Sequence, residues 1–265
     1  MKWLLIPLSL FIVYLFWANQ HLTISRYQIK APAELRIVHL SDIHNNWSSS
    51  ANRYLANKVR MLHPDLIIIT GDLFDYHHSG SERGLQLAQW LIEIAPVYFI
   101  HGNHEVMLQD PGLDDQLRSR GVRVLVNQKE SPVKGVTLIG LEDVDIIDIY
   151  DKQLQAEFLN EQLRQLADGK GYTILLSHQP QHFKLYCTYP VDLVLCGHAH
   201  GGQIRLPFTD GLYAPDQGLF PEYTSGRHEF NGTTMIVSRG IGRSLAPLRI
   251  FNDPEIVVLD LSDKE

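Results

Sequence analysis

Five short apolar segments of this chain each run directly into Asp, Asn or His, and this repeated pattern constrains the fold more than any other feature. The clearest case is segment 66–70, a β-branched run that ends at Gly71 and Asp72. Such a run is typical of a buried strand, and the glycine allows a tight turn just before the carboxylate. The other segments are 36–40, followed by Asp42 and His44; 97–100, followed by Asn103 and His104; 173–176, followed by His178; and 191–195, followed by His198 and His200.

These polar side chains are expected to meet, because sites in open α/β sheets form where the carboxyl ends of the strands converge. Carboxylate and imidazole ligands suit Mn, Fe or Zn better than Ca or Mg. Seven candidate ligands are too many for one ion, whereas two ions that share Asp72 as a bridge fit the number. The sequence therefore predicts a two-metal site of the kind found in hydrolases.

The order of the expected elements indicates the fold class. Strands and helices alternate first, with helices expected over 48–62, 84–94, 114–120 and 153–166, and a strand-rich tail follows. This pattern favours an α/β protein in which helices cover the sheets. The 265 residues suffice for one large domain, and no repeat or second domain is evident. We expect a catalytic domain over 35–265, preceded by a linker over 21–34 that could include one edge strand.

The N-terminal segment 3–18 is almost wholly apolar. Its length is slightly below the ~17–25 residues of a spanning helix. A cleaved signal peptide is one alternative, for which Ala18 suits the cleavage site and Phe16 does not; a buried core helix is another. We expect an uncleaved anchor over 1–20, a single transmembrane helix that places the protein at a membrane. Basic residues stand on both sides of it, so its orientation stays open.

Charge argues against nucleic acid as a partner. The formal net charge is −7 and the sequence has no run of Lys or Arg. Binding to nucleic-acid phosphates requires clustered positive charge, so no nucleic-acid partner is expected. The two cysteines, Cys187 and Cys196, do not indicate a disulfide framework.

The polar blocks together resemble a known superfamily. In order they are D-x-H at 42–44, G-D at 71–72, G-N-H-E at 102–105, His178 and G-H-x-H at 197–200. This set resembles the calcineurin-like metallophosphoesterases over roughly 35–261. The later segments GHAHGGQIRLP, SRGIG and PLR followed by PEI resemble a narrower branch of bacterial membrane-associated phosphodiesterases and UDP-2,3-diacylglucosamine hydrolases. The resemblance implies a four-layer α-β-β-α sandwich, two packed mixed sheets flanked by helices.

The resemblance also implies roles for single residues. One metal would be held by Asp42, His44, Asp72 and His200, and the other by Asp72, Asn103, His178 and His198. His104 would protonate the leaving oxygen or stabilise the transition state, with Asp75 as one possible acidic partner. The attacking group would be a hydroxide between two divalent ions, for which Mn is expected and Fe or Zn are alternatives.

Some assignments stay open between two interpretations. Arg239 and Arg249 could contact a substrate phosphate or form structural ion pairs, and His101 could support the site or have no role in it. Apolar residues of a tail over 202–249 could meet acyl chains or pack the tail to the core: Leu206, Phe208, Leu212, Leu219 and Phe220.

The expected activity is hydrolysis of a phosphodiester, phosphomonoester or pyrophosphate bond. The substrate is expected to be membrane-associated or lipid-linked, similar to UDP-2,3-diacylglucosamine, so that the partners are a phosphate ester and the bilayer. The alternatives are a metal-binding scaffold without catalysis and a protein phosphatase.

Overall fold

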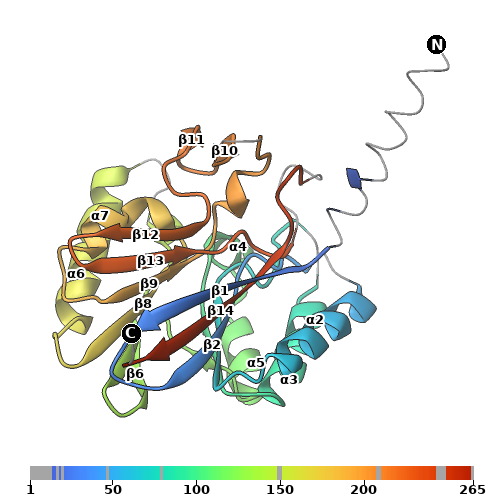
Figure 1. Cartoon of the computed structure of the whole chain (residues 1–265), viewed down its shortest axis with the longest axis horizontal. Coiled ribbons are helices and arrows are strands. Elements are labelled where there is room, and N and C mark those ends of the chain that lie inside the picture. Colours follow the sequence, from blue (N-terminus) through green and yellow to red (C-terminus); the bar gives the residue numbers. More distant parts are fainter. Residues whose placement is uncertain are drawn as a thin grey trace.

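The computed structural model describes residues 14, 15, 18, 21–45, 48–77, 80–147, 151–206, 210–242 and 249–263. These residues form two six-stranded mixed sheets with helices on their outer faces (Figure 1). The predicted α/β class, with mixed sheets flanked by helices, is confirmed.

The first sheet has the strand order β1–β14–β2–β3–β4–β5. Strands β2 to β5 are parallel, and β14 pairs antiparallel with β2 and parallel with β1. Their bounds are β1 Thr23–Lys30, β2 Leu35–Leu40, β3 Leu66–Thr70, β4 Val97–Ile100, β5 Arg123–Val124 and β14 Glu255–Ser262. The carboxyl ends of β2, β3 and β4 therefore lie at one edge.

The second sheet has the order β12–β13–β9–β8–β7–β6, with the four central strands parallel. The bounds are β6 Gln128–Val133, β7 Val136–Gly140, β8 Tyr172–Leu176, β9 Leu193–Cys196, β12 Gly226–Phe230 and β13 Thr233–Val237. A separate two-stranded antiparallel hairpin consists of β10 Tyr213–Ala214 and β11 Gly218–Leu219.

Helices cover the outer faces of both sheets. On the first sheet they are α2 Ser49–Met61, α3 Glu82–Ile92 and α5 Leu113–Ser119; on the second, α6 Lys152–Leu166 and α7 Phe183–Tyr186 (Figure 1). Ser48 caps α2 by accepting a hydrogen bond from the Ala51 N–H, as expected from the serines there, and Asp151 caps α6 in the same way. The remaining helical elements are α4 Asn103–Leu108, η1 Val144–Ile146, η2 Pro180–His182 and η3 His200–Gly202.

Three apolar layers hold these elements together. The alternation of a strand explains them: Ile67 of β3 packs in a cluster with Leu55 of α2, while Ile68 faces the other way and shares a cluster with Ile174 of β8. Leu175 of β8 in turn belongs to the cluster under α6 and α7. Each sheet is thus buried on both faces, which gives the layer order α-β-β-α and fixes both sets of strand ends.

Three local features differ from the expected elements or refine them. The edge strand that the linker over 21–34 could include is β1, which has eight residues and pairs with β14, so that most of the expected linker belongs to the first sheet. After η3, residues 203–206 form no strand of either sheet, and an isolated bridge joins Ile204 to Ile250. Helix α4, by contrast, was not expected, because it begins within the G-N-H-E block itself.

The expected N-terminal anchor over 1–20 lies outside the described residues, apart from 14, 15 and 18. Within the part of the chain that the structure describes, no helix combines the length and the apolar character needed to cross a bilayer.

Candidate metal centre

The carboxyl ends of five parallel strands deliver the predicted ligands to one place. Two donor groups form there, one of Asp42, His44, Asp72 and His200 and the other of Asp72, His178 and His198. Within each group one donor atom per residue lies within 4.8 Å of all the others. Asp72 belongs to both groups, which is the arrangement expected of a bridging carboxylate.

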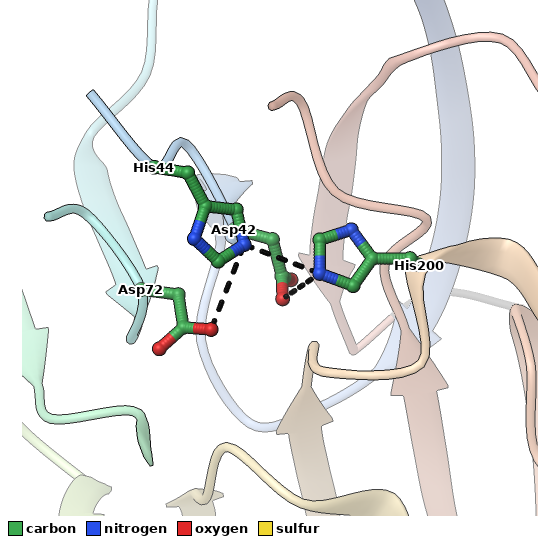
Figure 2. Close-up of side chains that lie close together, drawn as sticks. All are labelled: Asp42, His44, Asp72 and His200. Atoms are coloured by element: carbon green, nitrogen blue, oxygen red, sulfur yellow. Dashed lines mark hydrogen bonds and ion pairs between the residues drawn. The ribbon is translucent and has the colours of Figure 1, made fainter. Parts of the chain in front are cut away.

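The first donor group is drawn in Figure 2. His44 Nε2 lies 3.2 Å from His200 Nε2 and 3.6 Å from Asp72 Oδ2, and His200 Nε2 lies 3.3 Å from Asp42 Oδ1. All four side chains are buried. Two imidazole nitrogens that face each other and two carboxylates are better placed to bind a shared cation than to hydrogen-bond to each other.

The second donor group consists of Asp72, His178 and His198. His178 Nδ1 lies 2.6 Å from the Thr70 carbonyl oxygen, while its Nε2 lies 3.3 Å from Asp72 Oδ2. Donation to the carbonyl leaves Nε2 as the ring atom available to a metal. His198 Nδ1 lies 3.1 Å from the side-chain oxygen of Asn103, which brings the predicted amide ligand to this group.

The electrostatics of the centre suit cations. Burial alone would raise the pKa of Asp72, but the nearby imidazoles of His178 and His104 hold it well below its usual range. Burial lowers the pKa of His44 to about 4, so this imidazole is neutral at pH 7. An ionised carboxylate beside a neutral imidazole is the protonation state that metal binding requires. The residues present therefore fit two divalent ions.

Backbone strain concentrates at the same residues. Positive φ angles occur at Asp42 (52°), His44 (55°), Asp72 (52°), His198 (65°) and His200 (46°). Such angles are uncommon outside glycine and tend to cluster at functional sites. Five of the seven predicted ligands thus have a backbone conformation that the surrounding fold must impose. The strand-end pattern in the sequence did not indicate this strain.

Two glycines allow the segments to approach each other. A Cβ at Gly197 would overlap Ser41 Oγ and Asp42 Oδ2, and a Cβ at Gly102 would run into the Asp72 side chain. Any larger residue at either position would separate the strand ends that carry the ligands.

Glu105, the last residue of the G-N-H-E block, ties two ligand loops together. Its carboxylate accepts hydrogen bonds from the backbone N–H groups of Asp72 (2.7 Å), Phe74 (2.9 Å) and Gly102 (2.8 Å). Burial and the Asp72 charge raise the pKa of Glu105 to about 7, against the lowering effect of those hydrogen bonds. No role was predicted for Glu105, although its place in the G-N-H-E block was a signal for one.

His104 lies beside the first donor group. Its Nδ1 is 3.2 Å from Asp75 Oδ1 and its Nε2 is 4.0 Å from Asp72 Oδ2. The side chain is 17% exposed, unlike the fully buried His44 ring 4.4 Å away. Asp75, named above as one possible partner, is the carboxylate that faces His104. The same two residues and His44 also form a third group with donor atoms within 4.8 Å.

Asp216 reaches the centre from the turn of the β10–β11 hairpin. Its Oδ2 lies 2.8 Å from His198 Nε2, on the side of the ring opposite Asn103. Carboxylates in this position orient ligating imidazoles and fix their tautomer. Sequence reasoning missed Asp216, because an Asp between Pro215 and Gly218 signals only a turn.

His101 supports the loop that carries Asn103. Its Nδ1 lies 2.9 Å from Glu142 Oε1 and its Nε2 lies 2.8 Å from Asp114 Oδ1. Burial by itself would lower the pKa of His101, but the hydrogen bonds to Asp114 and Glu142 outweigh it and raise the pKa to about 10. A charged imidazole donates to both carboxylates, so a supporting role is the interpretation that the geometry favours.

The two arginines of the tail make structural contacts. Arg249 is buried and donates to the carbonyl oxygens of Gly242 (2.7 Å from Nη2) and Arg239 (2.8 Å from Nη1). Arg239 donates from Nη2 to Thr23 Oγ1 (2.8 Å) and lies 3.3 Å from Glu255 Oε1. Of the two interpretations that the sequence left open, these contacts favour the structural one over a contact with substrate.

Comparison with known proteins agrees with this centre. The family model for the calcineurin-like phosphoesterases matches residues 35–202. An uncharacterized metallophosphoesterase of Aquifex aeolicus is 29% identical over 96% of this chain and 99% of its own length. The phosphodiesterase YaeI of Escherichia coli is 31% identical over 75% of this chain and 70% of its own length.

A solved structure shares the fold at low identity. The dimetal phosphatase from Danio rerio has a TM-score of 0.51 at 13% identity, covering 78% of this chain and 88% of that chain. The family model spans more than half of the chain, and its range includes all seven predicted ligands and His104. This chain therefore belongs to the calcineurin-like phosphoesterase family.

Proposed function

We propose that this metal-dependent phosphoester hydrolase uses two divalent ions, Mn by preference, to cleave a phosphodiester or pyrophosphate bond in a lipid-linked substrate. The observation that carries the proposal is the pair of donor groups that share Asp72, with His104 beside them. The name of the YaeI relative supports a diester as the bond attacked.

Each ion has its own set of ligands in this proposal. One ion is held by Asp42, His44, Asp72 and His200, and the other by Asp72, Asn103, His178 and His198. When bound, the ions would lower the pKa of the attacking water and offset negative charge at the phosphate. Asn103 contributes an oxygen without charge, so the centre keeps a net attraction for the anionic substrate.

His104 acts as the general acid. It stands outside the two donor groups that share Asp72, and its side chain is 17% exposed to solvent. Asp75 at 3.2 Å orients the ring through Nδ1, so that Nε2 is the atom that delivers a proton to the leaving oxygen. The presence of His104 and all seven ligands argues against an inactive scaffold.

A lipid-linked substrate is favoured over a phosphoprotein by exposed apolar side chains near the centre. Leu219 and Phe220 belong to the same hairpin as Asp216, which contacts the ligand His198. Of the tail residues named in the sequence analysis, Phe208 lies outside the described residues and Leu212 is half-buried. The apolar segment 3–18 would hold the enzyme at the membrane where such a substrate resides.

A metal and substrate panel tests this function. Full-length protein in detergent is stripped with chelator and reloaded with Mn or Mg, and bound metal is measured beside hydrolysis of an aryl phosphodiester. Two ions per chain and better recovery with Mn are expected. One ion or fewer at full activity would contradict the two-metal proposal.

The same preparation is then given UDP-2,3-diacylglucosamine, phosphomonoesters and lipid phosphates. A higher kcat/KM on the lipid-linked diphosphate than on soluble esters is expected. A shortened control chain must begin at about residue 21, because a start at 33 would remove β1 from the sheet. Equal kcat/KM on soluble and lipid substrates in both chains would exclude the lipid-linked substrate and leave the general activity standing.

A further inference from the structure

Large apolar side chains project from the loops around the metal centre. On the β10–β11 hairpin, Leu219 is 67% exposed and Phe220 73% exposed, and Phe251 on a neighbouring loop is also exposed. In Figure 1 the hairpin stands beyond the second sheet, at the top of the view. Exposed apolar side chains gathered on one face mark an interaction surface.

The hairpin is fixed to the ligand loop and is not an independent flap. Leu212 N–H donates to the Gly202 carbonyl at 3.0 Å, and Phe220 N–H donates to the Leu212 carbonyl at 3.0 Å. The loop of Phe251 is joined to the same place, because Arg205 N–H donates to the Ile250 carbonyl at 2.9 Å. The exposed aromatic rings therefore keep a defined position relative to His200 and the metal centre.

Both aromatic residues stand on backbone that bulky side chains rarely adopt. The φ angle is 54° at Phe220 and 51° at Phe251. Left-handed backbone at a large residue persists only where the surrounding structure imposes it, and it tends to occur at functional segments. The fold thus holds two phenylalanine side chains outward instead of burying them.

The chain enters the fold at this same edge. Thr23 of β1 is paired with Glu255, and Val257 is paired with His39, one residue before the end of the first ligand strand. The start of β1 therefore lies level with the loop that carries Asp42. Tyr14, from the apolar N-terminal segment, accepts a hydrogen bond from Phe251 N–H at 2.7 Å, and the two rings lie 5.2 Å apart.

We propose that this edge docks on a lipid bilayer. The docking surface consists of Leu219 and Phe220 at the hairpin and Phe251 beside the entering chain. The apolar segment 3–18 supplies the argument for this occupant, since it precedes β1 directly and would place the bilayer at the edge where β1 begins. Aromatic side chains are well suited to the interfacial zone. The proposal rests on the proposed lipid-linked function and adds that the metal centre opens toward the membrane.

Docking is tested by fluorescence of full-length protein in vesicles of dibrominated phosphatidylcholine. The Phe220→Trp variant adds emission that bromine in the lipid chains should quench. Phe230→Trp is the matched control, because Phe230 is an exposed aromatic residue at the far end of β12, away from the ligand strand ends. Quenching of the emission added at 220, and not at 230, supports docking; equal emission in brominated and ordinary vesicles at both positions overturns it.

Activity separates docking from the choice of substrate. The double variant Leu219→Ser, Phe220→Ser should lose on the order of tenfold in kcat/KM on vesicle-embedded substrate, with little change on a soluble aryl diester. Quenching at 220 without cleavage of any lipid substrate would reject the proposed substrate and keep docking. Docking would be rejected, and the substrate kept, if the lipid substrate were cleaved with no quenching at 220. The same conclusion would follow if the double variant and Phe230→Ser were equally active on vesicles.

Discussion

The two halves of the metal centre hold their imidazoles in different ways. In the first donor group, the Nδ1 atoms of His44 and His200 have no hydrogen-bond partner among the described residues. In the second, His178 Nδ1 lies 2.6 Å from the Thr70 carbonyl oxygen and His198 Nε2 lies 2.8 Å from Asp216. The first half is oriented by packing and backbone conformation, and the second by hydrogen bonds to the ring.

The backbone follows this division in part, and the charge follows it further. Asp42, His44 and His200 all have positive φ, whereas in the second group His198 has positive φ and His178 does not. Burial lowers the pKa of His44 and His200, while the carboxylate of Asp72 raises the pKa of His178 against the effect of burial. We infer that the first ion's affinity depends on packing and backbone conformation, whereas the second ion's affinity depends also on the outer hydrogen-bond partners of the rings, which mutation can remove one at a time.

The largest effect is expected at the residue that the two halves share. Asp72→Asn should remove both ions and reduce hydrolysis of an aryl phosphodiester to background, since the amide cannot supply a bridging charge. His200→Ala and His198→Ala should each release one ion only. Metal content by mass spectrometry measures this, and loss of a single ion from Asp72→Asn would show that the halves are not joined there.

The second largest effect concerns His104, which lies against the first half alone. His104→Ala should keep both ions and lose about 10²-fold or more in rate, because the leaving oxygen is no longer protonated. The loss should shrink for esters with good leaving groups, which need less protonation. Rates across a series of aryl esters test this, and an equal loss for every ester would assign His104 to transition-state stabilisation instead.

A smaller effect is expected at Asp216, which supports the second half alone. Asp216→Asn should weaken one ion's affinity by about 10–100-fold and leave the other unchanged, as with other outer carboxylates. Asp210→Asn, at an exposed position in the loop before the hairpin, is the control. Metal titrations followed by calorimetry give both affinities. An equal loss of affinity for both ions would mean that the hairpin supports the whole centre.

Features that depend on residues close together in the chain could be predicted from the sequence. Strand β3 and its final Asp72 could be predicted because a buried apolar run, a glycine and a carboxylate stand next to each other in the chain. That the polar strand ends would converge followed from the rule for open α/β sheets. The grouping of Asp42 with His200, which follow strands of different sheets, and the pair of packed sheets were implied by the family resemblance.

The outer partners could not be predicted in this way. Asp216 reaches His198 through a turn whose position depends on how residues after η3 pack, and no period or motif encodes it. For β1 the sequence indicated only that an edge strand could lie within 21–34, because its polar, half-exposed residues do not show that they pair with β14. Arg249 was ambiguous because burial, not residue type, decides whether a guanidinium faces a substrate or carbonyl oxygens.

The smallest effect concerns His101, which braces the loop before Asn103 and so belongs to the outer support of the second half. Its pKa of about 10 lies above the ~6.5 of an unfolded histidine. The stabilisation is therefore complete below about pH 6.5 and disappears as the pH rises through about 10. In chelator-treated protein, His101→Gln should lower the melting temperature most at pH 6, and the gap to wild type should narrow steadily toward pH 10. Thermal unfolding monitored by circular dichroism measures the gap; a gap that stays constant with pH would mean that His101 supports the loop by packing and not by its charge.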